Sequence, residues 1–185
     1  MIEADTSRMK FIVDCMLGKL AKWMKILGFD VLYFSKIEDI ELVSRARKEA
    51  RILLSRDHAL LARARDLKKL FIESEAWEDQ VHQVADFFCL WDEMKPYSRC
   101  LECNVGLKPL AKSQAANLVA PFVLEKADSF AICPACGRVF WPGTHFEEME
   151  SKVSEILDRR GTDSSGWRKK RKGTPRPRPK ANNQT

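Results

Sequence analysis

The sequence predicts an α/β domain, in which a parallel sheet carries helices on both faces, followed by a small C-terminal cysteine-bearing module. Short apolar runs alternate with segments of helical periodicity from residue 10 to residue 91, and this alternation is typical of parallel sheets. Between Arg99 and His145, two CxxC pairs and four prolines take the place of long helices. We therefore expect a main domain over residues 9–95, a module over 96–150 and a disordered basic tail over 161–185.

The elements of the main domain follow from the period of the apolar residues. The predicted strands are the apolar runs 10–14, 30–34, 51–55 and 70–72. The predicted helices have apolar residues at helical spacing and cover 16–27, 39–49, 58–65 and 77–91, with a further helix over 146–160. Gly28 is expected to end the first helix, because glycine most easily takes the left-handed conformation found there.

Composition limits the size and the class of the protein. A chain of 185 residues with 45% apolar content has enough apolar surface for one moderate core and a small satellite module. No apolar run reaches the length of a membrane span, and the first residues lack the pattern of a signal peptide, so we expect a cytoplasmic protein. The net charge of +6 comes from the tail, which is expected to bind a polyanion or to direct nuclear import.

Three acids follow or precede the predicted strands in a pattern that points to a metal site. Asp14 ends the first strand, Asp57 directly follows the third, and Asp39 begins the second helix. In an open parallel sheet, the carboxyl ends of the strands meet at one edge, where ligands bind. Carboxylate oxygens suit Mg²⁺ or Mn²⁺, and such an ion orients and deprotonates water for attack on a phosphodiester.

The assignment of these acids leaves alternatives open. A single Asp beside a strand is also a common helix cap or turn former, and this alternative applies most directly to Asp39. Glu41 is the main rival of Asp39 as a ligand, and Glu38 is a weaker one that also has capping-box spacing with Ser35.

The cysteines divide into two pairs and two single residues. Four thiolates spaced as two CxxC pairs favour a tetrahedral, structural Zn²⁺ site, with disulfides or a redox pair as the alternative; they are Cys100, Cys103, Cys133 and Cys136. The interval between the pairs is expected to hold a small hairpin. Cys15 is expected to be buried as a small apolar residue.

A stripe of basic residues lies on the helix that follows Asp14. Lys19, Lys22 and Lys25 recur every three residues, so the phosphate backbone of a substrate is expected to lie along them. The alternative is an ordinary solvated helix face.

Four separated segments, 11–30, 51–57, 99–104 and 133–145, carry the first acid with its helix, the strand ending in Arg56-Asp57, and the two CxxC motifs. Together, over about residues 9 to 150, they resemble the mut-seven C-terminal RNase family. The resemblance implies a PIN-like nuclease domain with a zinc ribbon, and an RNA substrate hydrolysed at a Mg²⁺ or Mn²⁺ site. The alternative is a non-catalytic RNA-binding zinc-ribbon protein.

The resemblance also assigns roles to single residues. Its acids fall on Asp14, Asp39 and Asp57, and Ser55 stands where many relatives have threonine. Arg56 and His145 lie in family motifs and are candidates for RNA contact, with a structural role as the alternative for His145. PIN-like sites often use a fourth acid, for which this sequence offers Asp66, Glu73 and Glu75.

Overall fold

The structure is a computed structural model that describes residues 9–160, apart from the side chains of Thr144 and His145. The prediction of a disordered basic tail over 161–185 therefore concerns residues outside the described part of the chain. None of the described helices is long and apolar enough to cross a membrane.

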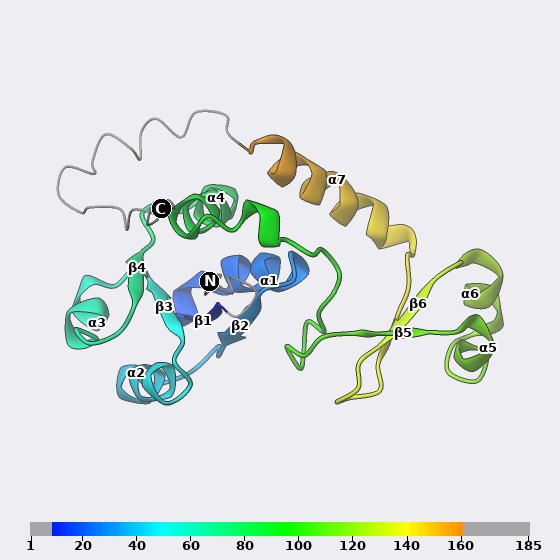
Figure 1. The fold of residues 1–185 in the computed structure, drawn as a ribbon, viewed down its shortest axis with the longest axis horizontal. Helices are drawn as coiled ribbons and strands as arrows, with labels where there is room; N and C mark the ends of the chain where they lie inside the picture. Colours follow the sequence, from blue (N-terminus) through cyan, green and yellow to red (C-terminus); the bar gives the residue numbers. More distant parts are fainter. Residues whose placement is uncertain (1–8, 161–185) are drawn as a thin grey trace, which may run out of the picture.

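The main domain is built on a four-stranded parallel sheet in the order β2-β1-β3-β4 (Figure 1). Its strands are β1 (Lys10–Val13), β2 (Asp30–Tyr33), β3 (Ile52–Ser55) and β4 (Lys69–Phe71). The helices that connect and follow them are α1 (Gly18–Ile26), α2 (Asp39–Lys48), α3 (His58–Arg63) and α4 (Trp77–Phe88). The predicted α/β class with a parallel sheet is confirmed.

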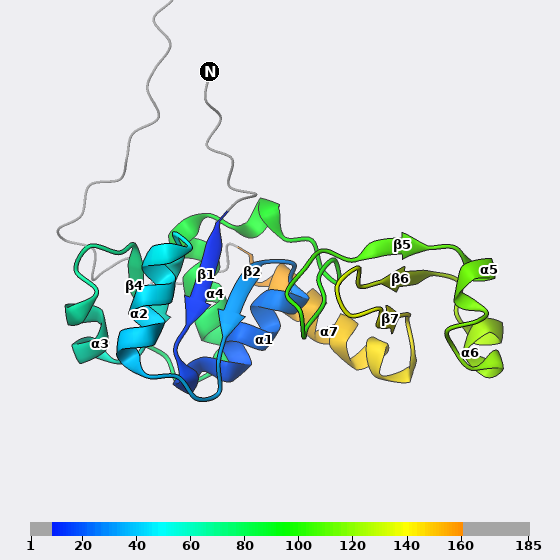
Figure 2. The same ribbon diagram turned by 90° about the horizontal axis from the view of Figure 1, so that it is seen from below.

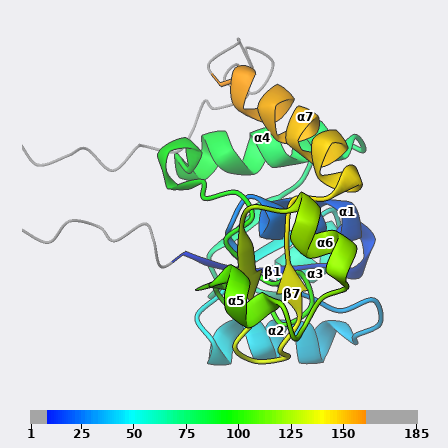
Figure 3. The same ribbon diagram turned by 90° about the vertical axis from the view of Figure 1, so that its right-hand side faces the viewer.

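Helices cover both faces of the sheet. Each strand contacts both layers of helices, because its successive side chains point to opposite faces. Phe11 and Val13 of β1 pack with α1 and α4, whereas Ile12 packs with α2 and α3. Figure 3 shows the two layers, with α1 and α4 above the sheet and α2 below it. Each strand is therefore apolar on both sides, as the continuous runs in the sequence predict.

The order of the strands defines a switch point between β1 and β3. The chain leaves β1 toward β2 on one side and returns through α2 to β3 on the other side of β1. At such a point the connections diverge and leave a crevice beyond the carboxyl ends of the two strands. Asp14 follows β1 and Asp57 follows β3, so the topology brings these two acids to the same crevice.

The first helix begins later than the sequence predicts. Residues Cys15–Leu17 form a 3₁₀ turn, and α1 starts only at Gly18. The tighter turn leaves Leu17 buried and Cys15 exposed, so the expectation of a buried Cys15 is wrong. Gly28 ends the helix at φ +97 as expected, and a Cβ there would lie 2.4 Å from the Lys95 carbonyl oxygen.

The last helix of the main domain is shorter than predicted. It ends at Phe88 because Cys89 takes the left-handed conformation, with φ 57. Residues Trp91–Glu93 then form a separate 3₁₀ turn, and the chain leaves toward the second module.

The second module contains a three-stranded antiparallel sheet in the order β5-β6-β7. Its strands are β5 (Lys108–Leu110), β6 (Phe130–Ile132) and β7 (Val139–Phe140). A hairpin is present between the cysteine pairs, but its connection also holds α5 (Lys112–Ala115) and α6 (Pro121–Lys126). These two helices lie at the far end of the module (Figure 2), and their own small apolar cluster explains why the interval is long.

The last described helix, α7 (Thr144–Asp158), returns to the main domain. Val153 and Ile156 belong to the apolar cluster of α1 and α4, and Arg160 pairs with Asp92 at 2.6 Å. The views in Figures 1 and 3 show α7 beside α4. The division between residues 9–95 and 96–150 stays a prediction, since α7 begins in the second segment and packs on the first.

Candidate functional site

Asp14 is the most enclosed acid at the crevice between β1 and β3. Its backbone N–H donates to the Leu54 carbonyl at 3.0 Å, and its side chain is 6% exposed. The carboxylate accepts a hydrogen bond from the Ser55 hydroxyl, with 2.7 Å between Oδ2 and Oγ. Among the salt bridges of residues 9–160 there is none to Asp14, so its charge is not neutralised by a described basic residue.

Ser55 connects the ends of the two central strands. Its hydroxyl donates to Asp14 and accepts the backbone N–H of Asp57 at 2.9 Å. Ser55 is fully buried at the end of β3, so these two bonds fix the hydroxyl in one orientation. The result is a fixed spacing between Asp14 and the loop that carries Asp57.

Asp57 caps the helix that follows it. Its Oδ1 accepts the backbone N–H groups of Ala59 at 2.6 Å and Leu60 at 3.2 Å, at the start of α3. A carboxylate in this position is also favoured by the positive end of the helix dipole. Helix capping, the alternative role of Asp39, is thus the observed role of Asp57. The cap holds the Asp57 carboxylate close to the end of β3.

Asp39 is the first residue of α2, and Glu38 before it makes no side-chain cap. The Asp39 carboxylate accepts a hydrogen bond from Arg63 at 3.0 Å, and the rival Glu41 lies 3.5 Å from Arg45. Within residues 9–160, the only described group of three or more metal-binding side chains is formed by cysteines. Convergence of Asp14, Asp39 and Asp57 on one ion therefore stays a prediction.

The three candidates for a fourth acid lie in different places. Asp66 makes a two-pronged ion pair with Arg47, at the end of α2 remote from Asp39. Hydrogen bonding to the Arg47 guanidinium lowers the pKa of Asp66 to about 2. Glu75 pairs with Arg56 at 3.0 Å, and Glu73 directly follows Ile72, which bonds to the Ser55 carbonyl. Only Glu73 and Glu75 thus follow a strand at the edge where Asp14 lies.

The exposed thiol next to Asp14 is poorly suited to act as a nucleophile. Its hydrogen bond to the Asp14 carboxylate, together with burial, raises the pKa of Cys15. The reactive form of cysteine is the thiolate, so a raised pKa keeps this side chain unreactive at neutral pH.

The donor chemistry of the crevice fits a divalent cation. Asp14 is a buried carboxylate whose described partners are a hydroxyl and a thiol, and neither neutralises its charge. Carboxylate and hydroxyl oxygens are ligands that Mg²⁺ and Mn²⁺ prefer.

The cysteines form a much more closed group. The Sγ atoms of the four residues all lie within 4.8 Å of one another, and those of Cys100 and Cys136 are 3.9 Å apart. Four sulfurs around a zinc ion at a Zn–S distance of about 2.3 Å lie about 3.8 Å apart, so the group fits Zn²⁺. All four positions are then occupied by protein, as in a structural site.

The two CxxC turns have the same backbone. The N–H of Asn104 donates to the Cys100 carbonyl, and that of Gly137 donates to the Cys133 carbonyl, both at 2.9 Å. Asn104 and Gly137 each follow the second cysteine of a pair and have φ values of 59 and 71. This repeated left-handed turn aims both thiols of a pair in one direction, which explains how the sequence spacing forms the site.

The thiols of the cluster differ in acidity in the absence of an ion. Hydrogen bonding to Cys136, and then burial, raises the pKa of Cys103 to about 12. For Cys133, burial acts in the same direction, but the backbone N–H groups of Cys136 and Ala135 outweigh it and lower the pKa to about 7.

The chain matches one known family over most of its length. The family described as Mut7-C RNAse domain matches residues 9–153. This chain belongs to the Mut7-C family. The resemblance found in the sequence is therefore confirmed, and the family indicates a ribonuclease-type function with RNA as substrate. No curated protein and no solved structure matches the chain.

The first cysteine turn of this Mut7-C domain also docks the ribbon on the sheet. Asn104 Oδ1 accepts the backbone N–H of Val31 at 3.0 Å, and its Nδ2 donates to Asp30 at 2.7 Å. The same Asp30 carboxylate accepts from Arg51 at 2.6 Å, and Arg51 also donates to the Phe11 carbonyl. Asn104 thereby covers the free edge of β2.

The sequence patterns of this Mut7-C domain point to neither Asn104 nor Arg51. Asn104 carried one available signal, because Asn is enriched at left-handed positions and here directly follows a CxxC pair. Arg51 begins a buried strand, where a charged residue requires a partner, but the sequence does not say which acid supplies it.

The basic residues predicted to contact RNA occupy different environments. Lys19 and Lys22 are exposed on α1, whereas Lys25 is half-buried and donates to the Leu101 carbonyl at 3.0 Å. Burial lowers the pKa of Lys25. Arg56 pairs with Glu75, and the side chain of His145 lies outside the described residues. An RNA contact by any of these residues stays a prediction.

Proposed function

We propose that this Mut7-C domain is a metal-dependent ribonuclease that hydrolyses RNA phosphodiester bonds at the edge formed by Asp14, Asp39 and Asp57. One observation carries the proposal: Asp14 is a buried carboxylate at the switch point of a parallel sheet, with no described basic partner. Burying an uncompensated charge is costly, and a bound cation removes that cost.

The protein residues divide the work of the proposed site. Ser55 orients Asp14, the first turn of α3 holds Asp57, and Arg63 holds Asp39 near the start of α2. A Mg²⁺ or Mn²⁺ ion bound by these carboxylates would supply a Lewis acid and a water of lowered pKa. The exposed Lys19 and Lys22 lie on the helix that begins beside Asp14, where they attract the phosphate backbone.

The zinc ribbon has a structural role in this proposal. Four protein ligands leave no position for water or substrate, so Zn²⁺ at the cysteine group stabilises the fold and takes no part in hydrolysis. The ribbon aids RNA binding by presenting its own surface next to α1, to which it is tied by the bond from Lys25 to Leu101.

The experiment is cleavage of single-stranded RNA in Mg²⁺ or Mn²⁺ by the wild type and by Asp14→Asn, which keeps the size of the side chain. We expect the variant to lose activity by about 100-fold or more, since it removes a carboxylate ligand of the cation. Asp128→Asn is the matched control, because Asp128 is an exposed acid of the second module. Equal cleavage by wild type and Asp14→Asn would show that the assigned site is wrong.

A second function is favoured by a different observation. Asp39 is engaged by Arg63, and the described acids form no closed group of the kind made by the cysteines. A non-catalytic RNA-binding protein would tolerate this arrangement. This second function predicts no RNA cleavage with Mg²⁺ or Mn²⁺. It also predicts that Asp14→Asn and Asp57→Asn bind RNA as tightly as the wild type.

A further inference from the structure

A pocket lies at the junction of the main domain, the ribbon and the start of α7. Its volume is about 260 Å³, and its walls include Tyr97, Arg99, Leu101, Trp141, Phe146 and Met149. Ile26 at the end of α1 also lines it, so the pocket touches all three parts of the molecule. Figure 2 shows the end of α1, the ribbon strands and α7 meeting in this region.

Aromatic side chains dominate the walls. The rings of Tyr97 and Phe146 lie 4.6 Å apart, and the indole of Trp141 is 40% exposed. Exposed and half-exposed aromatic rings next to a basic surface are the usual platforms on which single-stranded nucleic acids stack their bases.

Tyr97 is held in an unusual state at the pocket wall. Its backbone has φ 60, in the left-handed region that a bulky residue rarely occupies, and its N–H donates to the Ile26 carbonyl at 2.8 Å. Its hydroxyl is buried and has no hydrogen-bond partner in the described part of the chain. Strained residues and unpaired polar groups of this kind concentrate at ligand sites.

The charge around the pocket favours an anionic ligand. Arg99 donates to two backbone carbonyls, those of Gly28 and Asn104, and Lys25 donates to the carbonyl of Leu101. None of the salt bridges found within residues 9–160 includes either cation. Glu102 and Asp30 lie near Lys25 and partly offset its charge. Arg99, in the pocket wall, has no salt-bridge partner within residues 9–160, so its guanidinium is the group that favours a phosphate.

The pocket and the acid edge lie at the two ends of one helix. Helix α1 begins beside Asp14 and ends at Ile26, a span of about 12 Å at 1.5 Å per residue. Lys19, Lys22 and Lys25 follow each other along this span, and Lys25 reaches Leu101 in the pocket wall. A basic track thus leads from the acids to the aromatic pocket.

We propose that this pocket binds a base of single-stranded RNA whose backbone follows α1 toward the acid edge. That the bound polymer is RNA rests on the proposed ribonuclease function. The pocket adds the place where the strand is held, and its occupation by one base requires that this base is unstacked from its neighbours. Stacking on an aromatic ring tolerates any base, so the pocket favours single strands without selecting a sequence.

The test measures binding, without added Mg²⁺ or Mn²⁺, of a short fluorescent RNA and of an abasic strand with the same number of phosphates. Trp141→Ala in the full chain is expected to weaken binding of the RNA about 10-fold and to leave binding of the abasic strand unchanged. Trp141→Phe should retain most of the affinity because a ring remains.

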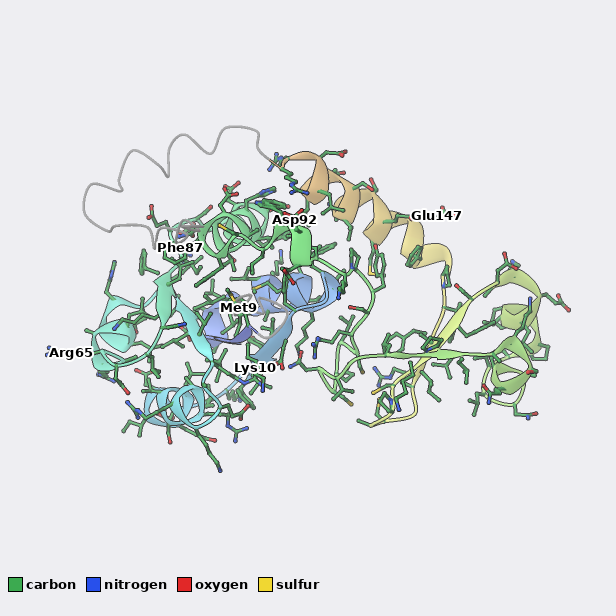
Figure 4. The ribbon with its side chains drawn as sticks, in the orientation of Figure 1. Met9, Lys10, Arg65, Phe87, Asp92 and Glu147 are labelled. Carbon is green, nitrogen blue, oxygen red and sulfur yellow. The ribbon has the colours of Figure 1, made fainter. Side chains whose placement is uncertain are left out.

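Phe87→Ala is the matched control, since Phe87 is an aromatic residue of 44% exposure at the end of α4, away from the pocket (Figure 4). The proposal is overturned if Trp141→Ala binds the RNA as tightly as wild type, or if it weakens both strands by the same factor. Failure of the proposed function is distinguishable, because base-dependent binding is read without cleavage and does not require Asp14.

Discussion

The cysteine group and the acid edge show two ways in which a chain assembles a site. Each cysteine pair is placed by a turn of a few residues, and the four sulfurs lie within 4.8 Å of one another. The acids come from three separate segments of the chain, and each already has its own partner: Ser55 for Asp14, the start of α3 for Asp57, and Arg63 for Asp39. The closed site therefore fits a permanent structural ion, whereas a cation at the open edge must compete with existing protein contacts.

The largest expected effect comes from breaking the closed site. Cys100→Ser removes a ligand from a fully buried position, and we expect zinc content to fall well below one equivalent. Structural zinc contributes about 10 kcal/mol or more to folding in small modules, so the ribbon should lose its cooperative unfolding transition. Zinc analysis and calorimetry measure the two effects.

Cys89→Ser is the control for the zinc prediction, because Cys89 is an exposed free cysteine outside the four-cysteine group. It should keep the zinc content and the unfolding transition of the wild type. Full zinc occupancy in Cys100→Ser would contradict the assignment of a four-thiolate site.

A smaller effect is expected from breaking ion pairs, and it separates an acid proposed to hold the catalytic ion from an acid that only pairs with an arginine. Asp39 pairs with Arg63 of α3, and Asp66, in the turn after α3, pairs with Arg47, so the two ion pairs lie at opposite ends of α2. Asp39→Asn should lower RNA cleavage by about 100-fold, since its carboxylate is proposed to hold the ion. Asp66→Asn breaks a similar exposed pair and should leave the cleavage rate unchanged.

Comparison of the two rates decides the role of Asp39. Equal activity of Asp39→Asn and Asp66→Asn would move the third acid to Glu41 or remove it from the site. The same pair of variants also separates loss of stability from loss of catalysis, because exposed ion pairs contribute only about 0–1 kcal/mol each.

The smallest effect concerns the contact between the ribbon and strand β2 of the main domain. Asn104→Gly keeps the left-handed backbone but loses the bonds to Val31 and Asp30, and should reduce the free energy of unfolding by about 1–3 kcal/mol. Asn104→Ala should reduce the free energy of unfolding by about 1–2 kcal/mol more than Asn104→Gly, because alanine, unlike glycine, places a Cβ at a left-handed position. Denaturant unfolding measures both changes.

Gly137→Ala provides the matched control in the other cysteine turn. Gly137 has the same left-handed backbone, and a Cβ there would meet nothing within 4 Å. Gly137→Ala should therefore lower the free energy of unfolding only by the cost of a Cβ at a left-handed backbone position. A loss for Asn104→Gly no larger than measurement error would mean that the Asn104 side chain does not hold the ribbon on the sheet.

The sequence by itself determined the order of strands and helices in the main domain and the four-cysteine pattern, and it predicted the three acids as a site. Apolar period separates strands from helices, and CxxC spacing needs only a local turn to aim its thiols, so both can be read along the chain. Asp14 and Asp57 follow parallel neighbouring strands, whose carboxyl ends meet at one edge, so their place at that edge can also be read from the sequence.

Only the tertiary structure decided which partners these residues have. The pairing of Asp39 with Arg63, the exposure of Cys15 and the docking of Asn104 on Val31 depend on how distant segments pack. The pocket between α1, the ribbon and α7 likewise joins residues far apart in the chain. Local spacing carries no information on such contacts, because they form only when the free energy of packing selects one arrangement of the whole chain.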